Sequence, residues 1–288
     1  ETVSILRAAQ KAGRTAIADA FAANPFAARP LTRSYTYLTD GLVMTAQKVA
    51  CTLLHPRPNP TAGEHIAVIA VGGYGRGEMA PFSDVDLLFL TPYKITPWAE
   101  STIESMLYIL WDLKLKVGHA SRTVKDCLRL GREDFTIRTA LLEHRLVDGH
   151  APLAEELDAQ LWSKLFKNTA AEFVEAKLEE RDVRHKRMGD SRYVLEPNIK
   201  DGKGGLRDLH TLYWAAKFLY MVQDISELVP QGKLTKLEAN SFAKAQQFLW
   251  TLRCHLHYLT DRPEERLTFD VQPELAKRMG YTDHAGAL

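Results

Sequence analysis

Two continuous apolar runs enclose a glycine-rich polar turn in the stretch from His65 to Leu90. Ile66–Val71 is apolar and rich in β-branched residues, which is typical of a buried strand. Gly72 and Gly73 end this run, and Val85–Leu90 predicts a second buried strand. The polar turn between these two strands is therefore the first place to look for a functional site.

Helical periodicity dominates the remainder of the chain. The predicted helices cover Glu1–Ala28 with an interruption at Asn24–Pro25, Leu31–Leu54, Trp98–Lys116, Lys125–Val147, Leu153–Met188 as one or two helices, Leu206–Val222 and Lys233–Tyr258. Val117–Thr123 is predicted as a third strand, and Asp270–Leu288 as an exposed end. Strand signals nearly vanish after Ala151, so we expect the rest of the chain to be helical.

Two breaks in the pattern divide the chain into three parts. Pro56–Gly63 is a turn-rich connector, and Gly149 marks the end of a helical run. We therefore predict N-terminal helices over residues 1–60, which pack on a domain over 61–150 that contains the strands. A helical bundle domain is predicted over 151–288.

Two aspartates stand at the start of the second strand, and their spacing suits a metal ion. Side chains alternate along a strand, so Asp84 and Asp86 are predicted to project from one face, with Cα atoms about 6.5 Å apart. Two such carboxylates can converge on one Mg²⁺ or hold two metal ions about 4 Å apart. Magnesium is usually bound by one or two carboxylates together with substrate phosphates.

The glycines before these aspartates favour a phosphate in the same place. Gly72 and Gly73 allow a tight turn and a close approach of the backbone to a phosphate, and Arg76 has the charge to neutralise it. The alternative is a hairpin-like turn whose aspartates only cap or solvate the strand end. We favour the functional interpretation, because paired aspartates directly before an apolar run are poor strand formers.

Composition narrows the setting but not the activity. The chain has 288 residues and a formal net charge of +1, which gives no general attraction to nucleic acid or to membranes. Cys51, Cys127 and Cys254 are far apart and form no CxxC pair, so we expect a reducing, cytoplasmic setting. No apolar run approaches the roughly 20 residues that a membrane span needs.

A second glycine-rich stretch with three cations lies between Arg192 and Asp208. Lys200, Lys203 and Arg207 cluster where this loop enters a predicted helix, an arrangement that suits an anion. An ordinary basic loop at a helix start has the same pattern, and a pair between Arg207 and Asp208 would make the cluster structural. The loop is not a Walker loop, because no Ser or Thr follows Lys203.

The histidines do not complete a metal site in this interpretation. The third strand offers His119 but no acid, so we cannot place a third metal ligand, and we favour a structural, hydrogen-bonded role for His119. His255 and His257 are two residues apart on a predicted helix, where they face different directions. A structural role is the favoured interpretation for both.

The first stretch, GGYGRGEMAPFSDVDLLFL, resembles the active-site signature of the nucleotidyltransferase superfamily. Together with EPNIKDGKGGLRDLHTLYWAAKF, it closely resembles the protein-PII uridylyltransferase/uridylyl-removing enzymes of bacterial nitrogen regulation, from about Leu31 to about Leu267. The resemblance implies an α+β fold, with a nucleotidyltransferase (polymerase-beta-like) domain that has a small mixed sheet, followed by an all-helical domain. The missing third carboxylate departs from the superfamily pattern.

The resemblance also implies roles for individual residues. Asp84 and Asp86 would be catalytic and would bind Mg²⁺ or Mn²⁺, while Gly72 and Gly73 would seat the triphosphate of UTP. The other candidate nucleotide-binding residues are Arg76, Ser83, Lys200, Lys203 and Arg207. The reaction would transfer UMP from UTP to a tyrosine of the signalling protein PII and release pyrophosphate.

Full-length members of that family also carry a His-Asp metal phosphohydrolase domain and glutamine-sensing ACT domains. Neither is recognisable in this sequence, so we expect the transferase portion only, with glutamine acting through domains absent here. Two alternatives stay open: a related enzyme that adenylylates glutamine synthetase, and a nucleotide-binding regulatory module without catalysis. A Rossmann domain fits less well, because Gly72–Gly77 does not give GxGxxG.

Overall fold

The computed structural model describes residues 1–189, 191, 193–222 and 224–282. They form two compact units, which we treat separately. Unit 1 comprises Glu1–Asp19, Thr32–Met79 and Ser83–Thr169, and unit 2 comprises Ala20–Leu31, Ala80–Phe82 and Ala170–Leu288.

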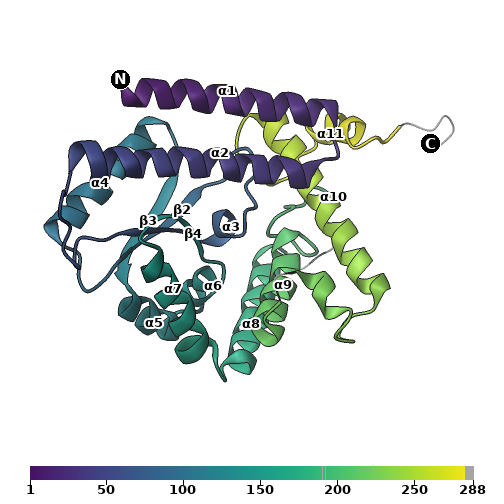
Figure 1. The fold of residues 1–288 in the computed structure, drawn as a ribbon. Helices are drawn as coiled ribbons and strands as arrows, with labels where there is room; N and C mark the ends of the chain where they lie inside the picture. Colours follow the sequence, from purple (N-terminus) through teal and green to yellow (C-terminus); the bar gives the residue numbers. More distant parts are fainter. Residues whose placement is uncertain (190, 192, 223, 283–288) are drawn as a thin grey trace. The chain divides into compact units, whose positions relative to one another are not determined.

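Unit 1 contains the sheet and the helices around it (Figure 1). Its strands are β1 (Ala67–Ala70), β2 (Val85–Thr91), β3 (Val117–Thr123) and β4 (Arg145–Gly149). Its helices are most of α1 (Thr2–Ala23) and of α2 (Ala28–Val49), the π-helices η1 (Ala50–Leu54) and η2 (Leu161–Phe166), α3 (Gly72–Gly75), α4 (Pro97–Asp112), α5 (Val124–Glu133), α6 (Phe135–Leu142) and α7 (Ala151–Gln160).

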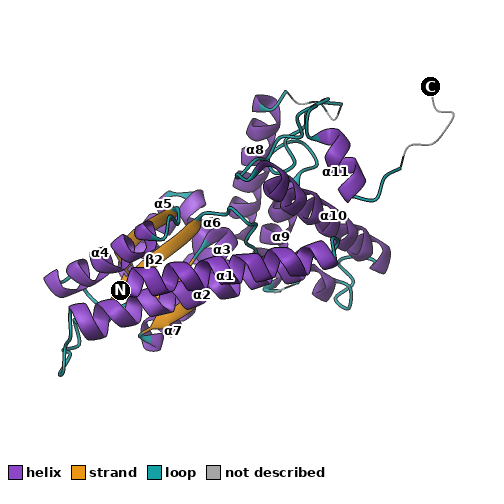
Figure 2. Cartoon of the chain, turned by 90° about the horizontal axis from the view of Figure 1, so that it is seen from above, coloured by secondary structure: helices purple, strands orange, loops and turns teal. Residues whose placement is uncertain are grey.

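The sheet has the strand order β3-β2-β1-β4 and mixed strand directions. β1 runs antiparallel to β2 and to β4, whereas β2 and β3 run parallel. Helix α2 lies on one side of the sheet and α5, α6 and α7 lie on the other (Figures 1 and 2). Because helices cover both faces, β2 is buried along nearly its whole length, which explains its continuous apolar run. The predicted α+β fold with a small mixed sheet is confirmed.

Local sequence signals set the helix boundaries beside the sheet. At the start of α4, the Thr96 hydroxyl accepts a hydrogen bond from the Ala99 N–H, and Pro97 occupies the first turn, where it needs no N–H partner. At the start of α5, Thr123 and Asp126 form a reciprocal capping box. The capping box ends β3 and starts α5 without an intervening loop, which keeps the helix against the sheet.

The prediction of one helix over Lys125–Val147 is wrong at its end. The helical run ends at Leu142, and β4 pairs with β1, where Arg145 lies opposite Ala70. A segment this short has no strand preference strong enough to read from the sequence, because its pairing partner lies far away along the chain. The predicted exposed end is also wrong in part, as described for unit 2 below.

The predicted domain limits and the compact units divide the chain at different residues. The second predicted domain begins at residue 151, whereas the change of unit falls after Thr169. The reason is that α7 packs against the sheet and α5, and η2 packs against α5 and α7, which keeps residues 151–169 in unit 1. The three-domain division itself stays a prediction.

Among the described residues of unit 2, the regular elements are helices, apart from an isolated bridge between Asn198 and Arg266. Its further helices are α8 (Ala170–Arg187), α9 (Leu206–Tyr220), the 3₁₀-helix η3 (Ile225–Leu228), α10 (Lys236–Thr260) and α11 (Gln272–Arg278). One core cluster joins Ile199 to residues of α10 and α11, and a second joins α9 to η3.

Helix α11 corrects the prediction of an exposed end. Leu275 on this helix is 2% exposed, and Val271 just before it is also buried. Residues 283–288 of the predicted end lie outside the described part of the chain. No helix within the described residues combines the length and the apolar character that crossing a bilayer requires.

Candidate functional site

The glycine-rich turn forms directly after β1. Val71 is extended, Gly72 has φ +60°, a left-handed value that favours glycine, and Gly72–Gly75 then make one helical turn. The Gly75 N–H donates to the Val71 carbonyl, at 3.0 Å. Among the described residues, the N–H groups of Gly72, Gly73 and Tyr74 have no hydrogen-bond acceptor. The turn therefore presents three backbone donors, as a phosphate site requires.

The two aspartates lie at the start of β2, next to this turn. Asp84 is exposed and precedes the first strand residue, while Asp86 is the second residue of the strand. The Val71 N–H donates to the Asp86 carbonyl at 3.1 Å, so β1 and β2 hold the turn and Asp86 together. Because Asp84 lies outside the strand, its projection from the same face as Asp86 stays a prediction.

Two glycines leave room for the carboxylate of Asp86. A Cβ atom at Gly118 would stand 2.6 Å from Asp86 Oδ1, which is closer than real Cβ contacts. A Cβ atom at Gly72 would stand 3.3 Å from Asp86 Oδ2. Gly118 is the residue of β3 that pairs with Asp86. The role of Gly118 is not apparent from the sequence, since only the strand register shows that it lies opposite Asp86.

The two carboxylates of Asp84 and Asp86 suit Mg²⁺ or Mn²⁺ only if the substrate supplies further oxygen ligands. No group of three or more His, Cys, Asp or Glu residues that could hold a metal ion exists within the described residues. His119 pairs with Leu87, one position away from the Asp86–Gly118 pair, so its side chain points to the other face of the sheet. Two carboxylates beside glycine space suit a magnesium ion that also takes phosphate oxygens and water.

Arg76 lies in a different environment from the one that the sequence suggests. Its guanidinium forms ion pairs with Glu78, at 2.8 Å, and with Glu143, at 2.5 Å, and its side chain is 10% exposed. Burial opposes its charge, but the charges of Glu143 and Glu78 outweigh burial and raise the pKa of Arg76. Phosphate binding by Arg76 stays a prediction, and this geometry favours a role in holding the turn.

The second loop, in unit 2, is organised by Asn198 and two glycines. The Asn198 side-chain oxygen accepts hydrogen bonds from the N–H groups of Lys200 and Asp201, at 3.0 and 2.7 Å. A Cβ atom at Gly205 would lie 3.0 Å or less from three carbonyl oxygens, and Gly204 has φ +81°. The glycines are therefore needed for the compact loop itself.

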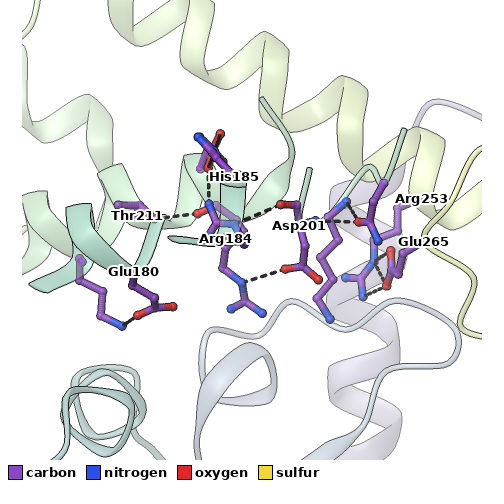
Figure 3. Close-up of polar contacts among 12 residues, drawn as sticks. Glu180, Arg184, His185, Asp201, Thr211, Arg253 and Glu265 are labelled. Atoms are coloured by element: carbon purple, nitrogen blue, oxygen red, sulfur yellow. Dashed lines mark hydrogen bonds and ion pairs between the residues drawn. The ribbon is translucent and has the colours of Figure 1, made fainter. Parts of the chain in front are cut away.

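Asp208, near the start of α9, occupies the position where an anion was expected. One of its oxygens accepts a hydrogen bond from the Gly204 N–H, at 2.7 Å. His185 Nε2 lies 2.9 Å from both oxygens, and Arg184 is paired with the same carboxylate. Figure 3 shows Arg184 and His185 side by side at this junction. The chain thus supplies its own anion at this helix start.

The three cations of the loop have different surroundings. Arg207 lies 3.4 Å from Asp201 and above the Trp214 ring. The Lys200 ammonium makes no ion pair within 4 Å in the described part of the chain; burial, and then the charge of Arg253, lower its pKa. Lys203 lines a groove of about 1070 Å³ along α8 and α9. Lys200 and Lys203 remain candidate ligands for an anion, and the geometry favours a structural role for Arg207.

Comparisons with known proteins match two stretches of the chain to family models. A family model described as a nucleotidyltransferase domain matches residues 61–129, and one described as GlnD PII-uridylyltransferase matches residues 172–288. The first match contains the glycine turn, Asp84 and Asp86, and the second contains the loop before α9.

Close relatives align with nearly the whole chain. It is 68% identical over 284 residues to the bifunctional uridylyltransferase/uridylyl-removing enzyme of Ruegeria pomeroyi. The aligned residues make up 99% of this chain and 31% of that protein. Proteins with the same description from Cereibacter sphaeroides and Azospirillum brasilense are 66% and 55% identical, over 96% and 99% of this chain and 30% of each relative. The chain thus spans about a third of the length of these relatives.

Proposed function

We propose that this chain, which belongs to the family of bifunctional uridylyltransferase/uridylyl-removing enzymes, carries a transferase site that moves UMP from UTP to an acceptor hydroxyl. The observation that carries the proposal is the juxtaposition at the ends of β1 and β2. Three backbone N–H groups without an acceptor in the described residues lie next to Asp86, whose carboxylate has room between two glycines. Donors for phosphate and ligands for a metal ion thus occupy one corner of the sheet.

The chain's residues would divide the work of the reaction. The N–H groups of Gly72, Gly73 and Tyr74 bind phosphate oxygens, and Asp84 and Asp86 hold Mg²⁺ or Mn²⁺. When bound, the metal neutralises charge on the triphosphate and aligns the reacting groups. The acceptor oxygen bonds to the α-phosphorus, the bond to the β-phosphate oxygen breaks, and pyrophosphate leaves. A carboxylate oxygen of Asp84 or Asp86 takes the proton of the acceptor hydroxyl.

The acceptor in this proposal is a tyrosine of a PII protein. The support is the PII-uridylyltransferase family model and the relatives' description as uridylyltransferases. A tyrosine hydroxyl with a pKa near 10 also loses its proton more readily than a serine hydroxyl would. The proposal includes no nucleic acid or membrane partner.

The test is transfer of labelled UMP from UTP to purified PII in the presence of Mg²⁺. Labelled PII is expected, and Asp84→Asn or Asp86→Asn should slow its formation by about 10³-fold or more, because several kcal/mol of metal stabilisation are lost. Asp112→Asn, at an exposed position on α4, is the matched control and should retain normal transfer. Near-normal transfer by the Asp84→Asn/Asp86→Asn double variant would refute the site.

Two further measurements separate the alternatives. Competition between UTP and ATP distinguishes uridylylation from adenylylation, since a related adenylylating enzyme would prefer ATP. A regulatory module without catalysis would bind nucleotide but release no pyrophosphate when metal and PII are added.

A further inference from the structure

Tyr74 stands in the middle of the glycine turn, and its side chain is 1% exposed. A buried phenol hydroxyl needs a hydrogen-bond partner, because leaving it unpaired is costly. Here the hydroxyl donates to Asp40 Oδ1 on α2, at 2.7 Å. The turn that presents the three N–H donors is therefore attached by its own side chain to a helix on one side of the sheet.

Arg145 on β4 binds the same carboxylate. Its two terminal nitrogens each donate to one oxygen of Asp40, both at 2.9 Å, which is the two-point geometry of a strong pair. One of them also lies 3.4 Å from the Tyr74 carbonyl, and the guanidinium lies 5.4 Å from the centre of the Tyr74 ring. A helix, the turn and an edge strand thus meet at Asp40.

The electrostatics keep the Tyr74 phenol protonated and the Arg145 guanidinium charged. Burial, and then the charge of Asp40, raise the pKa of Tyr74, so the phenol remains a donor. Burial alone would lower the pKa of Arg145, but its hydrogen bond to Asp40 and the Asp40 charge raise it, so the guanidinium stays charged.

The opposite end of the turn is held separately. A Cβ atom at Gly75 would stand 2.0 Å from the Glu143 carbonyl oxygen, and Arg76 is paired with Glu143. The carbonyls of Gly72 and Gly73 accept hydrogen bonds from the N–H groups of Arg76 and Glu78, at 3.0 and 2.9 Å, so this part of the turn is held by its own backbone. The junction of Tyr74, Asp40 and Arg145 adds the side-chain link from the turn to α2 and β4.

We propose that Asp40 and Arg145 are positioning residues: through Tyr74 they hold the N–H groups of Gly72, Gly73 and Tyr74 in the orientation that binds phosphate. The inference rests on the proposed function, since it names residues that prepare the phosphate site. Donors held in place before the nucleotide arrives need no reorganisation when it binds. Neither residue touches the nucleotide in this proposal.

Three variants of the 288-residue chain test this link. Tyr74→Phe removes only the hydroxyl, Asp40→Asn removes the charge, and Arg145→Lys keeps a charge but loses the two-point geometry. For Tyr74→Phe and Asp40→Asn we expect the Kd of UTP with Mg²⁺, measured by calorimetry without PII, to rise about tenfold. Arg145→Lys should give a smaller rise.

A positioning role has readouts that a purely structural role lacks. KM for UTP should rise while kcat in the PII assay changes little, because the ground-state contacts to phosphate weaken. The double variant Tyr74→Phe/Asp40→Asn should be no worse than the poorer single variant, since both cut one link. Amide exchange of Gly75–Glu78, whose N–H groups are hydrogen-bonded in the turn, should become faster in Tyr74→Phe.

The matched controls are Tyr108→Phe, at an exposed tyrosine of α4, and Arg129→Lys, at an exposed ion pair of α5. Both should leave the Kd and the exchange unchanged. If the wild-type chain binds UTP and Tyr74→Phe binds it equally well with unaltered exchange, the positioning role is wrong. If the wild-type chain does not bind UTP at all, the proposed function fails, and the positioning role fails with it.

Discussion

At the scale of single residues, Gly118 decides how much room the carboxylate of Asp86 has. The residue opposite Asp86 in the parallel pair with β3 has no side chain, and any Cβ atom there would collide with Asp86 Oδ1. The sequence of this strand offers no carboxylate as a third metal ligand. The structure shows glycine opposite the carboxylate, where the chain provides space instead.

Gly118→Ala should therefore weaken Mn²⁺ binding and UMP transfer by about tenfold or more. The added methyl group displaces the Asp86 carboxylate, and each tenfold loss corresponds to about 1.4 kcal/mol. Mn²⁺ titration followed by electron paramagnetic resonance and the labelled-UTP assay are the measurements.

Gly41→Ala is the matched control, because a Cβ atom there meets nothing within 4 Å. It lies on α2 in the same unit and should slightly stabilise the helix without changing Mn²⁺ affinity. A Gly118→Ala chain that binds Mn²⁺ as tightly as the Gly41→Ala chain would show that Asp86 does not need this space.

At the scale of elements, Asp208 joins α8 to the start of α9. Its carboxylate is shared by Arg184, His185 and the Gly204 N–H; the contacts with Arg184 and His185 are partly buried, and the one with Gly204 is exposed. Removing the Asp208 carboxylate would leave these three partners without the anion that they share. The loop before α9 should accordingly be a rigid part of unit 2.

Asp208→Asn should destabilise the chain by about 2 kcal/mol, since a neutral amide cannot balance the charge of Arg184 and has only one oxygen to accept hydrogen bonds. The measurement is the free energy of urea unfolding, followed by tryptophan fluorescence. Asp182→Asn, at an exposed pair with Arg181, serves as the control and should change the free energy by less than about 0.5 kcal/mol. Equal effects of the two substitutions would contradict the assigned role of Asp208.

The elements also show what a sequence alone can predict. The sequence predicts the strands β1 and β2 and the glycine turn, because continuous apolar runs and glycines are local signals. It does not predict the strand β4, since these five residues gain their structure from pairing with β1. The same holds for the junction at Asp40, whose partner Arg145 lies 105 positions away. Local sequence patterns predict single helices and strands, whereas contacts between distant elements can be identified only from the folded structure.

At the scale of the whole molecule, one buried ion pair links stability to pH. Glu265 pairs with Arg253, at 2.6 Å, and the two side chains are 16% and 8% exposed (Figure 3). Burial opposes ionisation of Glu265, but its contacts with His257 and Arg253 outweigh burial and lower its pKa to about 2. The folded-state pKa lies below the unfolded value, so this stabilisation is complete at neutral pH. It is lost as the pH falls from about 4.5 toward 2.

The stability difference between the wild-type chain and Glu265→Gln should therefore shrink as the solution becomes acidic. We expect a gap of about 3 kcal/mol near pH 7 that narrows steadily below about pH 4.5. Urea unfolding at a series of pH values measures it. Glu133→Gln, at an exposed pair with Arg129, should differ little from wild type throughout. A gap for Glu265→Gln that stays constant down to pH 2 would contradict this assignment.

The pairing of β1 on its two sides has a consequence for the order in which the chain folds. Ala70 pairs with Leu87, 17 positions away, and with Arg145, 75 positions away. Closing the longer loop costs about 1.3 kcal/mol more in chain entropy, and such distant contacts form late. We therefore expect the hairpin of β1 and β2 to bring the glycine turn next to Asp86 early. Docking of β4 would then lock the turn in a late step of folding.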